Sequence, residues 1–283
     1  MTSILSIQSS VAYGHVGNSA ATFPLMRRGI EVWPVYTVHF SNNTSYQAWR
    51  GPTLSAEDVL EVVRGIDDRG VLGRCDAVLS GYQGSEDTGS AVLAAVELVR
   101  SRNPQAIYCC DPVMGDIDRG VYVRPSIPEF MRAKVVPAAQ VITPNQFELE
   151  LLTGKPTATA DQVLLAAREV LDLGPQTVLV TSVLDENEPD EMSMIMVNAD
   201  GAWQVRTPLL REKFTGAGDL TAAVFLGGLL TEADPVRALA DTAAVAYGVL
   251  SITSQIGARE LQLVAAQDVI AAPARTFEPI RLG

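Results

Sequence analysis

Short runs of apolar and β-branched residues alternate along the chain with longer segments whose apolar positions recur at helical spacing. The first such run, residues 4–7, is followed by a glycine-containing loop and by a helix-like segment around residues 20–26. Further strand-like runs occupy residues 30–38, 75–81, 105–112, 141–145 and 177–182. Alternation of strands with helices is typical of βαβ units. The pattern therefore predicts a central, mostly parallel sheet between two helical layers, a three-layer αβα sandwich of the α/β class.

Local signals refine this prediction. Pro34 lacks an N–H group, so its run is expected to be an edge strand or to carry a bulge. Ser55 precedes an acidic first turn and predicts the start of a helix. Residues 192–198 and 202–207 follow an acidic turn and alternate as an antiparallel hairpin does, and residues 234–254 predict a long helix. Because the sequence contains no repeat and no linker-like tract, we expect one domain spanning residues 1–283.

Charge and composition exclude several classes of function. Among 283 residues, 33 are acidic and 21 are Lys or Arg, which gives a net charge of −12. Nucleic-acid and anionic-membrane surfaces both need a basic patch, so neither partner is expected. The three cysteines show no CxxC spacing, and the first ten residues lack a basic start and a cleavage site. We therefore expect a reduced, cytoplasmic protein without a membrane span.

Polar residues follow the predicted strands, where ligands of parallel α/β folds gather. Asp111 comes directly after an apolar strand, and Asp116 lies after Gly115 in a predicted loop. Asn145 and Glu148 are three residues apart at a helix start, which places them on one face. A purely structural alternative is open for this pair, since Asn145 can cap the helix and Glu148 can complete a capping box.

The segment FTGAGDLTAAVFLGG, residues 214–228, begins an apolar helix with three small residues. Gly216, Ala217 and Gly218 leave backbone N–H groups uncovered at the helix N-terminus, where an anion is stabilised. Asp219 lies beside them. On this segment alone, an anion site with a neighbouring acid and a simple tight turn with a first-turn cap are equally good interpretations.

Taken together, the strand ends favour phosphoryl transfer. Several carboxylates in one cleft would repel one another unless a cation lay among them. A cation, an anion-binding helix start and a lone acid are the components that transfer of a nucleotide phosphoryl group requires. No GxxxxGK[ST] segment occurs in the sequence, so a Walker-type kinase is excluded.

GAGD at residues 216–219 resembles the signature of the ribokinase-like superfamily. The segments IQSSVAYGHVGNSAATFPL, VHFSNNTSY, DAVLSGYQGS, CDPVMGD, KVVPAAQVITPNQFELELLTG and GPQTVLV resemble, in order and spacing, those of the pyridoxal kinases. The resemblance extends from Ile4 to about Asp268. It implies a ribokinase-like fold and ATP-dependent phosphorylation of the 5′-hydroxyl of pyridoxal, with pyridoxine and pyridoxamine as further substrates, in vitamin B6 salvage.

The resemblance also implies roles for individual residues. Asp219 would accept the hydroxyl proton, and the amides of Gly216, Ala217 and Gly218 would hold the γ-phosphate charge. The vitamin would contact Ser9, Val16, Phe40, Thr44, Ser45, Tyr82 and Asp219. ATP would contact Asp111, Thr143, Asn145, Glu148, Thr181, Ser182, Glu212, Lys213, Phe214 and Thr215. Mg²⁺ and a monovalent cation such as K⁺ would be organised by Asp111, Asp116 and Glu148.

Two other functions stay open at this stage. Asn43, Thr181, Thr215 and Ala217 depart from residues common among pyridoxal kinases, and TGAGD is closer to sugar and hydroxymethylpyrimidine kinases. A hydroxymethylpyrimidine kinase of thiamine synthesis is therefore the first alternative, and a non-catalytic B6-binding protein is the second. The mean hydropathy of +0.17 predicts some apolar surface covered by a second copy, and the resemblance implies a homodimer.

Overall fold

The computed structural model describes residues 1–232 and 234–283. Within these residues, a central sheet has the strand order β11-β10-β9-β8-β7-β4-β3-β1-β2. Its strands are β1 (Ser3–Val11), β2 (Glu31–Phe40), β3 (Ala77–Ser80), β4 (Ile107–Cys110), β7 (Val141–Ile142), β8 (Thr177–Val183), β9 (Glu191–Asn198), β10 (Gly201–Pro208) and β11 (Ile280–Leu282). The six strands from β8 to β2 are parallel, and β9, β10 and β11 extend the sheet in antiparallel fashion.

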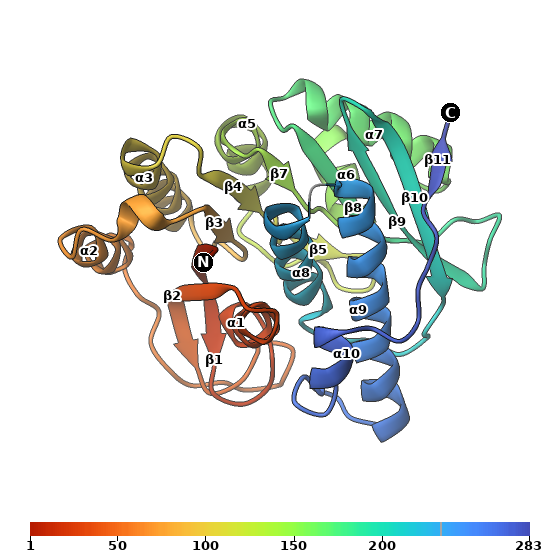
Figure 1. Ribbon diagram of the computed structural model, residues 1–283, viewed down its shortest axis with the longest axis horizontal. Coiled ribbons are helices and arrows are strands. Elements are labelled where there is room, and N and C mark those ends of the chain that lie inside the picture. The colour runs from red at the N-terminus through yellow and green to blue at the C-terminus, as the bar shows by residue number, and fades with distance from the viewer. Residues whose placement is uncertain (233) are drawn as a thin grey trace.

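Helices cover both faces of this sheet (Figure 1). One layer contains α2 (Ala56–Asp67), α3 (Glu86–Arg102), α4 (Ile127–Phe130), a π-helical turn (Met131–Val135), α5 (Val136–Ala138), α6 (Gln146–Thr153) and α7 (Ala160–Asp172). The other layer contains α1 (Asn18–Arg27), α8 (Ala217–Thr231), α9 (Pro235–Ile256) and α10 (Gln267–Ala271). A short 3₁₀ turn (Leu72–Arg74) precedes β3. The predicted three-layer αβα sandwich is confirmed.

Several local predictions are confirmed. Ser55 caps α2 in a full capping box with Asp58. Pro34 lies in β2, which is the edge strand of the sheet. The edge position tolerates the missing donor, because an edge strand has one side without a pairing partner.

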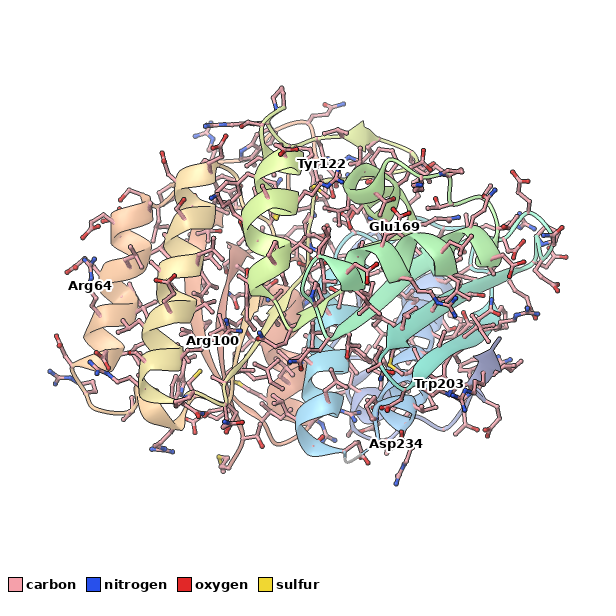
Figure 2. The ribbon with its side chains drawn as sticks, turned by 90° about the horizontal axis from the view of Figure 1, so that it is seen from above. Arg64, Arg100, Tyr122, Glu169, Trp203 and Asp234 are labelled. Carbon is pink, nitrogen blue, oxygen red and sulfur yellow. The ribbon has the colours of Figure 1, made fainter. Side chains whose placement is uncertain are left out.

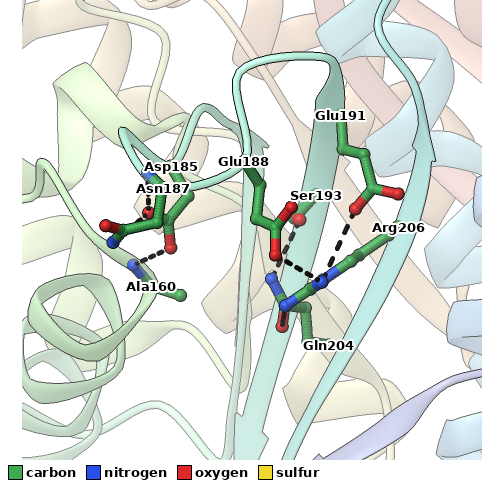
Figure 3. Close-up of polar contacts among 8 residues, drawn as sticks. All are labelled: Ala160, Asp185, Asn187, Glu188, Glu191, Ser193, Gln204 and Arg206. Carbon is green, nitrogen blue, oxygen red and sulfur yellow. Dashed lines mark hydrogen bonds and ion pairs between the residues drawn. The ribbon is translucent and has the colours of Figure 1, made fainter.

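The acidic turn before β9 is stabilised by one arginine, as Figure 3 shows. Nη1 of Arg206 on β10 lies 3.3 Å from Glu188 and 3.6 Å from Glu191. At the start of the same turn, Asp185 accepts a hydrogen bond of 2.9 Å from the Ala160 N–H at the N-terminus of α7. The turn is therefore attached to the strand and helix beside it.

Among the described residues, α9 alone is long and apolar enough to cross a membrane. Half of its most apolar stretch is buried inside the protein, where Leu239 and Ala243 pack into the core on this face of the sheet. The apolar composition of α9 is thus explained by packing. Charged side chains lie on the outer helices instead, such as Arg64 of α2 in Figure 2, which pairs with Glu57 and Glu61.

Candidate active site

The start of α8 is shaped by a glycine with a special backbone. Gly216 precedes the first helical residue with φ of 90°, and a Cβ at this position would collide with the backbone carbonyl oxygen of His15. A side chain would therefore be strained and would also separate two chain segments that must touch. No side-chain cap covers the first N–H groups of α8, and the Ala217 N–H makes only a long bond of 3.4 Å to the Phe214 carbonyl, so this positive end of the helix dipole is open to an anion.

Asp219 lies in the first turn of α8 and is half-buried. The backbone N–H of Gly17, the residue before α1, lies near its carboxylate and favours the ionised form. The carboxylate therefore lies between the N-terminal ends of two helices. Burial raises the pKa of Asp219 from 3.8 to about 6, against the effect of the Gly17 N–H. An acid with this pKa is ionised at pH 7 and is still basic enough to take a proton.

Ser9 lies next to Gly17. A Cβ on Gly17 would collide with both the backbone and the hydroxyl oxygen of Ser9. The pairing of β1 with β2 shifts register between Gln8 and Ser10, so Ser9 occupies an irregular point of the strand. Bulges of this kind commonly redirect side chains near functional sites. Ser9 and Asp219 thus each lie near Gly17, although they come from opposite ends of the sequence.

A cluster of carboxylates lies beside the start of α8. Asp111 is 5% exposed and accepts a hydrogen bond of 3.2 Å from the Thr143 hydroxyl. Its Oδ2 lies 3.8 Å from the position that a Cβ on Gly218 would take. Burial raises the pKa of Asp111 well above its ordinary value, and the negative charges of Glu148 and Asp219 raise it further. The three acids are therefore close enough for their charges to affect one another, and their role as one binding site stays a prediction.

Glu148 has a structural role that the sequence left open. Asn145 and Glu148 form a capping box at α6, in which each side chain accepts a hydrogen bond of 2.9 Å from the other's backbone N–H. The second carboxylate oxygen of Glu148 accepts 2.8 Å from the Met114 N–H, and Asn145 donates 2.8 Å to the Gly115 carbonyl. Burial nevertheless raises the pKa of Glu148 to about 7.

Asp116 was expected in a loop, and this expectation was wrong. Gly115 and Asp116 form a two-residue strand, β5, that pairs with β6 (Gly120–Val121). The Asp116 carboxylate accepts the N–H groups of Asp118 and Arg119 at 3.1 and 2.8 Å, which closes the turn of this hairpin. A two-residue strand is too short to leave a periodic pattern in the sequence.

Tyr122, labelled in Figure 2, follows the same hairpin. Burial and the charges of Glu148, Asp116 and Asp111 raise the pKa of its hydroxyl. In the part of the chain that the structure describes, no group of three or more His, Cys, Asp or Glu side chains is arranged to hold a metal ion directly. Direct ligation by Asp111, Asp116 and Glu148 therefore stays a prediction.

The remaining nucleotide residues expected from the sequence lie within β8 and before α8. Thr181 is buried and donates its N–H to Pro144 at 2.9 Å. Ser182 is exposed with φ of 53°, and it is the one residue other than glycine with a positive φ among residues 1–232 and 234–283. This conformation costs about 1–2 kcal/mol, and such strain clusters at functional sites.

Residues 212–215, which precede α8, are held by contacts at both ends of the segment. Glu212 accepts 2.6 Å from the Ser254 hydroxyl, and Lys213 lies 3.0 Å from Asp118 of the β5–β6 hairpin. Phe214 packs against the apolar cluster of α8 and α9. Thr215 pairs its backbone with Glu260, which follows α9. These residues line a continuous path from the hairpin to the start of α8.

The other expected vitamin contacts lie on three loops. Val16 precedes α1, and Phe40 lies at the end of β2 with its ring 6.4 Å from that of Trp49. Thr44 is exposed and Ser45 half-buried in the following loop, and Tyr82 follows β3. A cavity of about 610 Å³ between the N-terminal ends of α2 and α3 includes none of these residues.

Two residues of this region were missed by sequence reasoning. Gly17 places an N–H near Asp219, and Glu260 is a buried carboxylate that contacts two of the loops. A glycine before a helix is a recognisable signal at Gly17. Nothing in the local pattern around Glu260 distinguishes it from an ordinary surface acid.

The comparisons with known proteins agree with this site. The family model described as "Phosphomethylpyrimidine kinase" matches residues 74–263, so the chain belongs to this family of small-molecule kinases. Over 98% of its length the chain is 59% identical to the pyridoxal kinase of Rubrobacter xylanophilus, of which it covers 96%. It is 50% identical to the pyridoxal kinase of Leifsonia xyli, with 99% of each chain covered. Within the family, the chain belongs to the pyridoxal kinases.

Solved structures give the same result for the fold. The pyridoxal kinase of Leishmania donovani, in complex with ADP and ginkgotoxin, matches with a TM-score of 0.94 and 27% identity over the whole of both chains. The complex of the same enzyme with ADP and pyridoxamine matches equally well. The fold is therefore that of the ribokinase-like kinases.

Proposed function

We propose that this protein is an ATP-dependent pyridoxal kinase, which transfers the γ-phosphoryl group of ATP to the 5′-hydroxyl of pyridoxal. One observation carries the proposal: Asp219 lies between the N-terminal ends of α8 and α1, with its pKa raised to about 6. An acid in this position can take a proton from an alcohol that approaches the uncovered amides of a helix start. The similarity to pyridoxal kinases over nearly the full chain supports the choice of alcohol.

The reaction uses these residues in one step. The O–H bond of the vitamin breaks as its proton passes to Asp219, the hydroxyl oxygen bonds to the γ-phosphorus, and the bond to the β-phosphate oxygen breaks to release ADP. Catalysis of such a transfer consists mainly of positioning and charge stabilisation. The amides of Ala217 and Gly218, after Gly216, are placed to stabilise negative charge on the transferred group.

The donor set suits a magnesium ion. Asp111, Asp116 and Glu148 offer only hard oxygen atoms, and the raised pKa values of Asp111 and Glu148 come from burial and from neighbouring negative charge. When bound with ATP, Mg²⁺ supplies charge neutralisation for the phosphate oxygens. Because the Glu148 oxygens already accept backbone N–H groups, we expect Glu148 to act through metal-bound water. A monovalent cation such as K⁺ would occupy the same acidic region.

The two substrates would enter from different sides. Ser9 and Thr44 would hydrogen-bond the pyridine ring substituents, and Val16, Phe40, Ser45 and Tyr82 would surround the ring. Thr143, Asn145, Thr181, Ser182 and residues 212–215 would contact ATP. The vitamin side would thus belong to β1, the end of β2 and the loops after β1, β2 and β3, and the nucleotide side to the residues after β7, within β8 and before α8.

A hydroxymethylpyrimidine kinase is the second candidate, because the matching family model is that of phosphomethylpyrimidine kinases. A coupled ADP-release assay with pyridoxal, pyridoxine and hydroxymethylpyrimidine, each with and without Mg²⁺ and K⁺, decides between them. We expect Mg²⁺-dependent turnover with a higher kcat/KM on pyridoxal. Turnover on the pyrimidine alone would transfer the assignment to thiamine synthesis, and no turnover on any alcohol would refute the kinase assignment.

The raised pKa of Asp219 predicts an acidic limb in the pH profile. Asp219 must be ionised to accept a proton, so kcat/KM should fall about tenfold per pH unit below pH 6 and level off above it. Glu148, with its pKa at about 7, and Asp111, whose pKa burial raises well above its ordinary value, are the other acids of the site that burial affects in this way. Measuring the profiles of Glu148→Gln and Asp111→Asn beside the wild type separates them from Asp219. Loss of the limb in either variant would contradict the assignment to Asp219.

We further propose that residues 1–283 act as a single cytoplasmic domain that forms a homodimer. The exposed apolar side chains of Met26, Leu165 and Val264 show that apolar surface is available. Sedimentation at micromolar concentration measures the association, and a monomer there would contradict the proposal.

A further inference from the structure

A buried carboxylate outside the catalytic cluster joins three parts of the molecule. Glu260 lies after the C-terminal end of α9 and is 6% exposed. Its Oε2 accepts 3.1 Å from the His15 N–H, and its Oε1 accepts 3.0 Å from Nδ2 of Asn43 and 2.8 Å from the Tyr46 hydroxyl. The donors belong to two loops, residues 12–17 after β1 and residues 41–46 after β2.

The second of these loops is also held by the preceding residue. The guanidinium of Arg259 lies 3.7 Å from the centre of the Tyr46 ring, and its Nη2 donates 2.9 Å to the Ser45 carbonyl. Within the loop, Asn43 Oδ1 accepts the Ser45 N–H at 3.0 Å. Asn43 therefore connects Ser45 to Glu260, and residues 259 and 260 together fix the path of the loop.

Glu260 also contacts the start of the catalytic helix. Its backbone pairs with that of Thr215, one residue before Gly216. His15, whose N–H donates to Glu260, also contacts Gly216: its carbonyl oxygen is the atom against which Gly216 packs. The same short segment thus contacts both loops and the residues that begin α8.

The stability of the folded protein does not by itself require an acid at position 260. Among the residues that the structure describes, Glu260 takes part in no ion pair within 4 Å, and a buried carboxylate without a partner cation is costly. Three hydrogen bonds compensate its desolvation. A carboxylate that is buried without a salt bridge and accepts donors from two separate loops is well suited to fix the distance between them.

We propose that Glu260 is a positioning residue for the vitamin: it holds the loops that carry Val16, Thr44 and Ser45 at a fixed distance from Asp219. The inference rests on the proposed pyridoxal kinase function for its choice of substrate. It assigns Glu260 no contact with pyridoxal, ATP or the transferred phosphoryl group.

The test compares Glu260→Gln, Glu260→Ala and Tyr46→Phe with the wild type. Hydrogen bonds to a charged acceptor contribute enough that their loss should raise KM for pyridoxal roughly 10- to 100-fold in Glu260→Ala. Glu260→Gln keeps one acceptor oxygen for Asn43 and Tyr46, and Tyr46→Phe removes one donor, so both should show smaller increases. We expect kcat and KM for ATP to change less than about threefold in all three, because the catalytic residues are untouched.

Asp268→Asn is the matched control, since Asp268 is a fully solvated acid of the same C-terminal region that pairs only loosely with Arg27 at 3.4 Å. It should leave all three constants unchanged. Amide hydrogen exchange of the ligand-free protein gives a readout that needs no turnover. Residues 12–17 and 41–46 should exchange at least tenfold faster in Glu260→Ala, while the interior of α8 keeps its wild-type protection.

Two results would overturn the inference. If kcat fell, both KM values rose and exchange protection were lost throughout the protein, Glu260 would be an ordinary stabilising residue. Unchanged KM for pyridoxal and unchanged exchange of the two loops would show that it positions nothing. If the wild type fails to phosphorylate pyridoxal while the loops still loosen in Glu260→Ala, the proposed function is wrong and the positioning by Glu260 is retained.

Discussion

Asp219→Asn is expected to lower kcat for pyridoxal phosphorylation by roughly 10²- to 10⁴-fold, the contribution of a general base in comparable reactions. The amide has nearly the shape of the carboxylate, so the start of α8 and its contact with α1 should persist. It cannot accept the hydroxyl proton. KM values for ATP and pyridoxal should therefore stay within a few-fold of the wild type, and steady-state kinetics measures all three constants.

Asp241→Asn is the matched control for this variant. Asp241 is another acid whose burial raises its pKa, and it lies on α9, paired with Arg28 at 2.5 Å. Its replacement should change stability but leave kcat unchanged. Wild-type turnover in Asp219→Asn would refute the role of Asp219 as the base.

Asp219→Asn should also stabilise the ligand-free protein at neutral pH. The pKa of Asp219 rises from 3.8 to about 6 on folding, so its ionised form is less stable in the folded state than in the unfolded chain. This cost is complete above pH 6 and disappears below about pH 4. Asp219→Asn should therefore gain on the order of 1–2 kcal/mol at pH 7, after allowance for partial exposure, and none at pH 4. Urea denaturation at both pH values tests the sign.

Gly216→Ala is expected to have the second largest effect. The added Cβ would meet the His15 carbonyl oxygen, and the residue would keep a positive φ that disfavours any side chain. Relief of the collision must move the start of α8 away from the loop after β1. Displacing donors that stabilise a developing negative charge costs roughly 10²- to 10³-fold in kcat. Kinetics and thermal unfolding should both show the loss.

Gly29→Ala separates the effect of the collision from the effect of the positive φ. Gly29 also has a positive φ, of 80°, but a Cβ there would meet nothing within 4 Å. This variant should lose only about 1 kcal/mol of stability, the cost of the backbone conformation, and keep full activity. Equal losses of activity in the two variants would mean that the collision at Gly216 has no functional consequence.

Much of the fold was predictable because its signals are local. Pro34 indicated the edge strand, Ser55 the start of α2, and the run of Ala and Val after Asp219 the helix that packs on the sheet. The short β5–β6 hairpin was not predicted, since two-residue strands carry no period. Asp116 was consequently placed in a loop.

The candidate site was predictable to a similar extent. Asp111 stood out because it directly follows an apolar strand, whereas Asp219 and Glu148 at helix starts could equally have been caps, and their roles came from the resemblance to pyridoxal kinases. The capping role of Glu148 was visible as an alternative, and the structure shows it to be present. Glu260 could not be found in this way, because its carboxylate accepts hydrogen bonds from residues more than 200 positions away.

The span of those contacts has a consequence for synthesis of the chain. His15 and Glu260 are separated by 245 residues, so the vitamin-side loops are made well before the residue that fixes them. Because a ribosome adds about 5–20 residues per second, these loops wait roughly 12–50 s for Glu260. A nascent chain thus has no finished vitamin site until Glu260 has been made. Substrate binding in a refolding experiment should accordingly be recovered only after the sheet has formed.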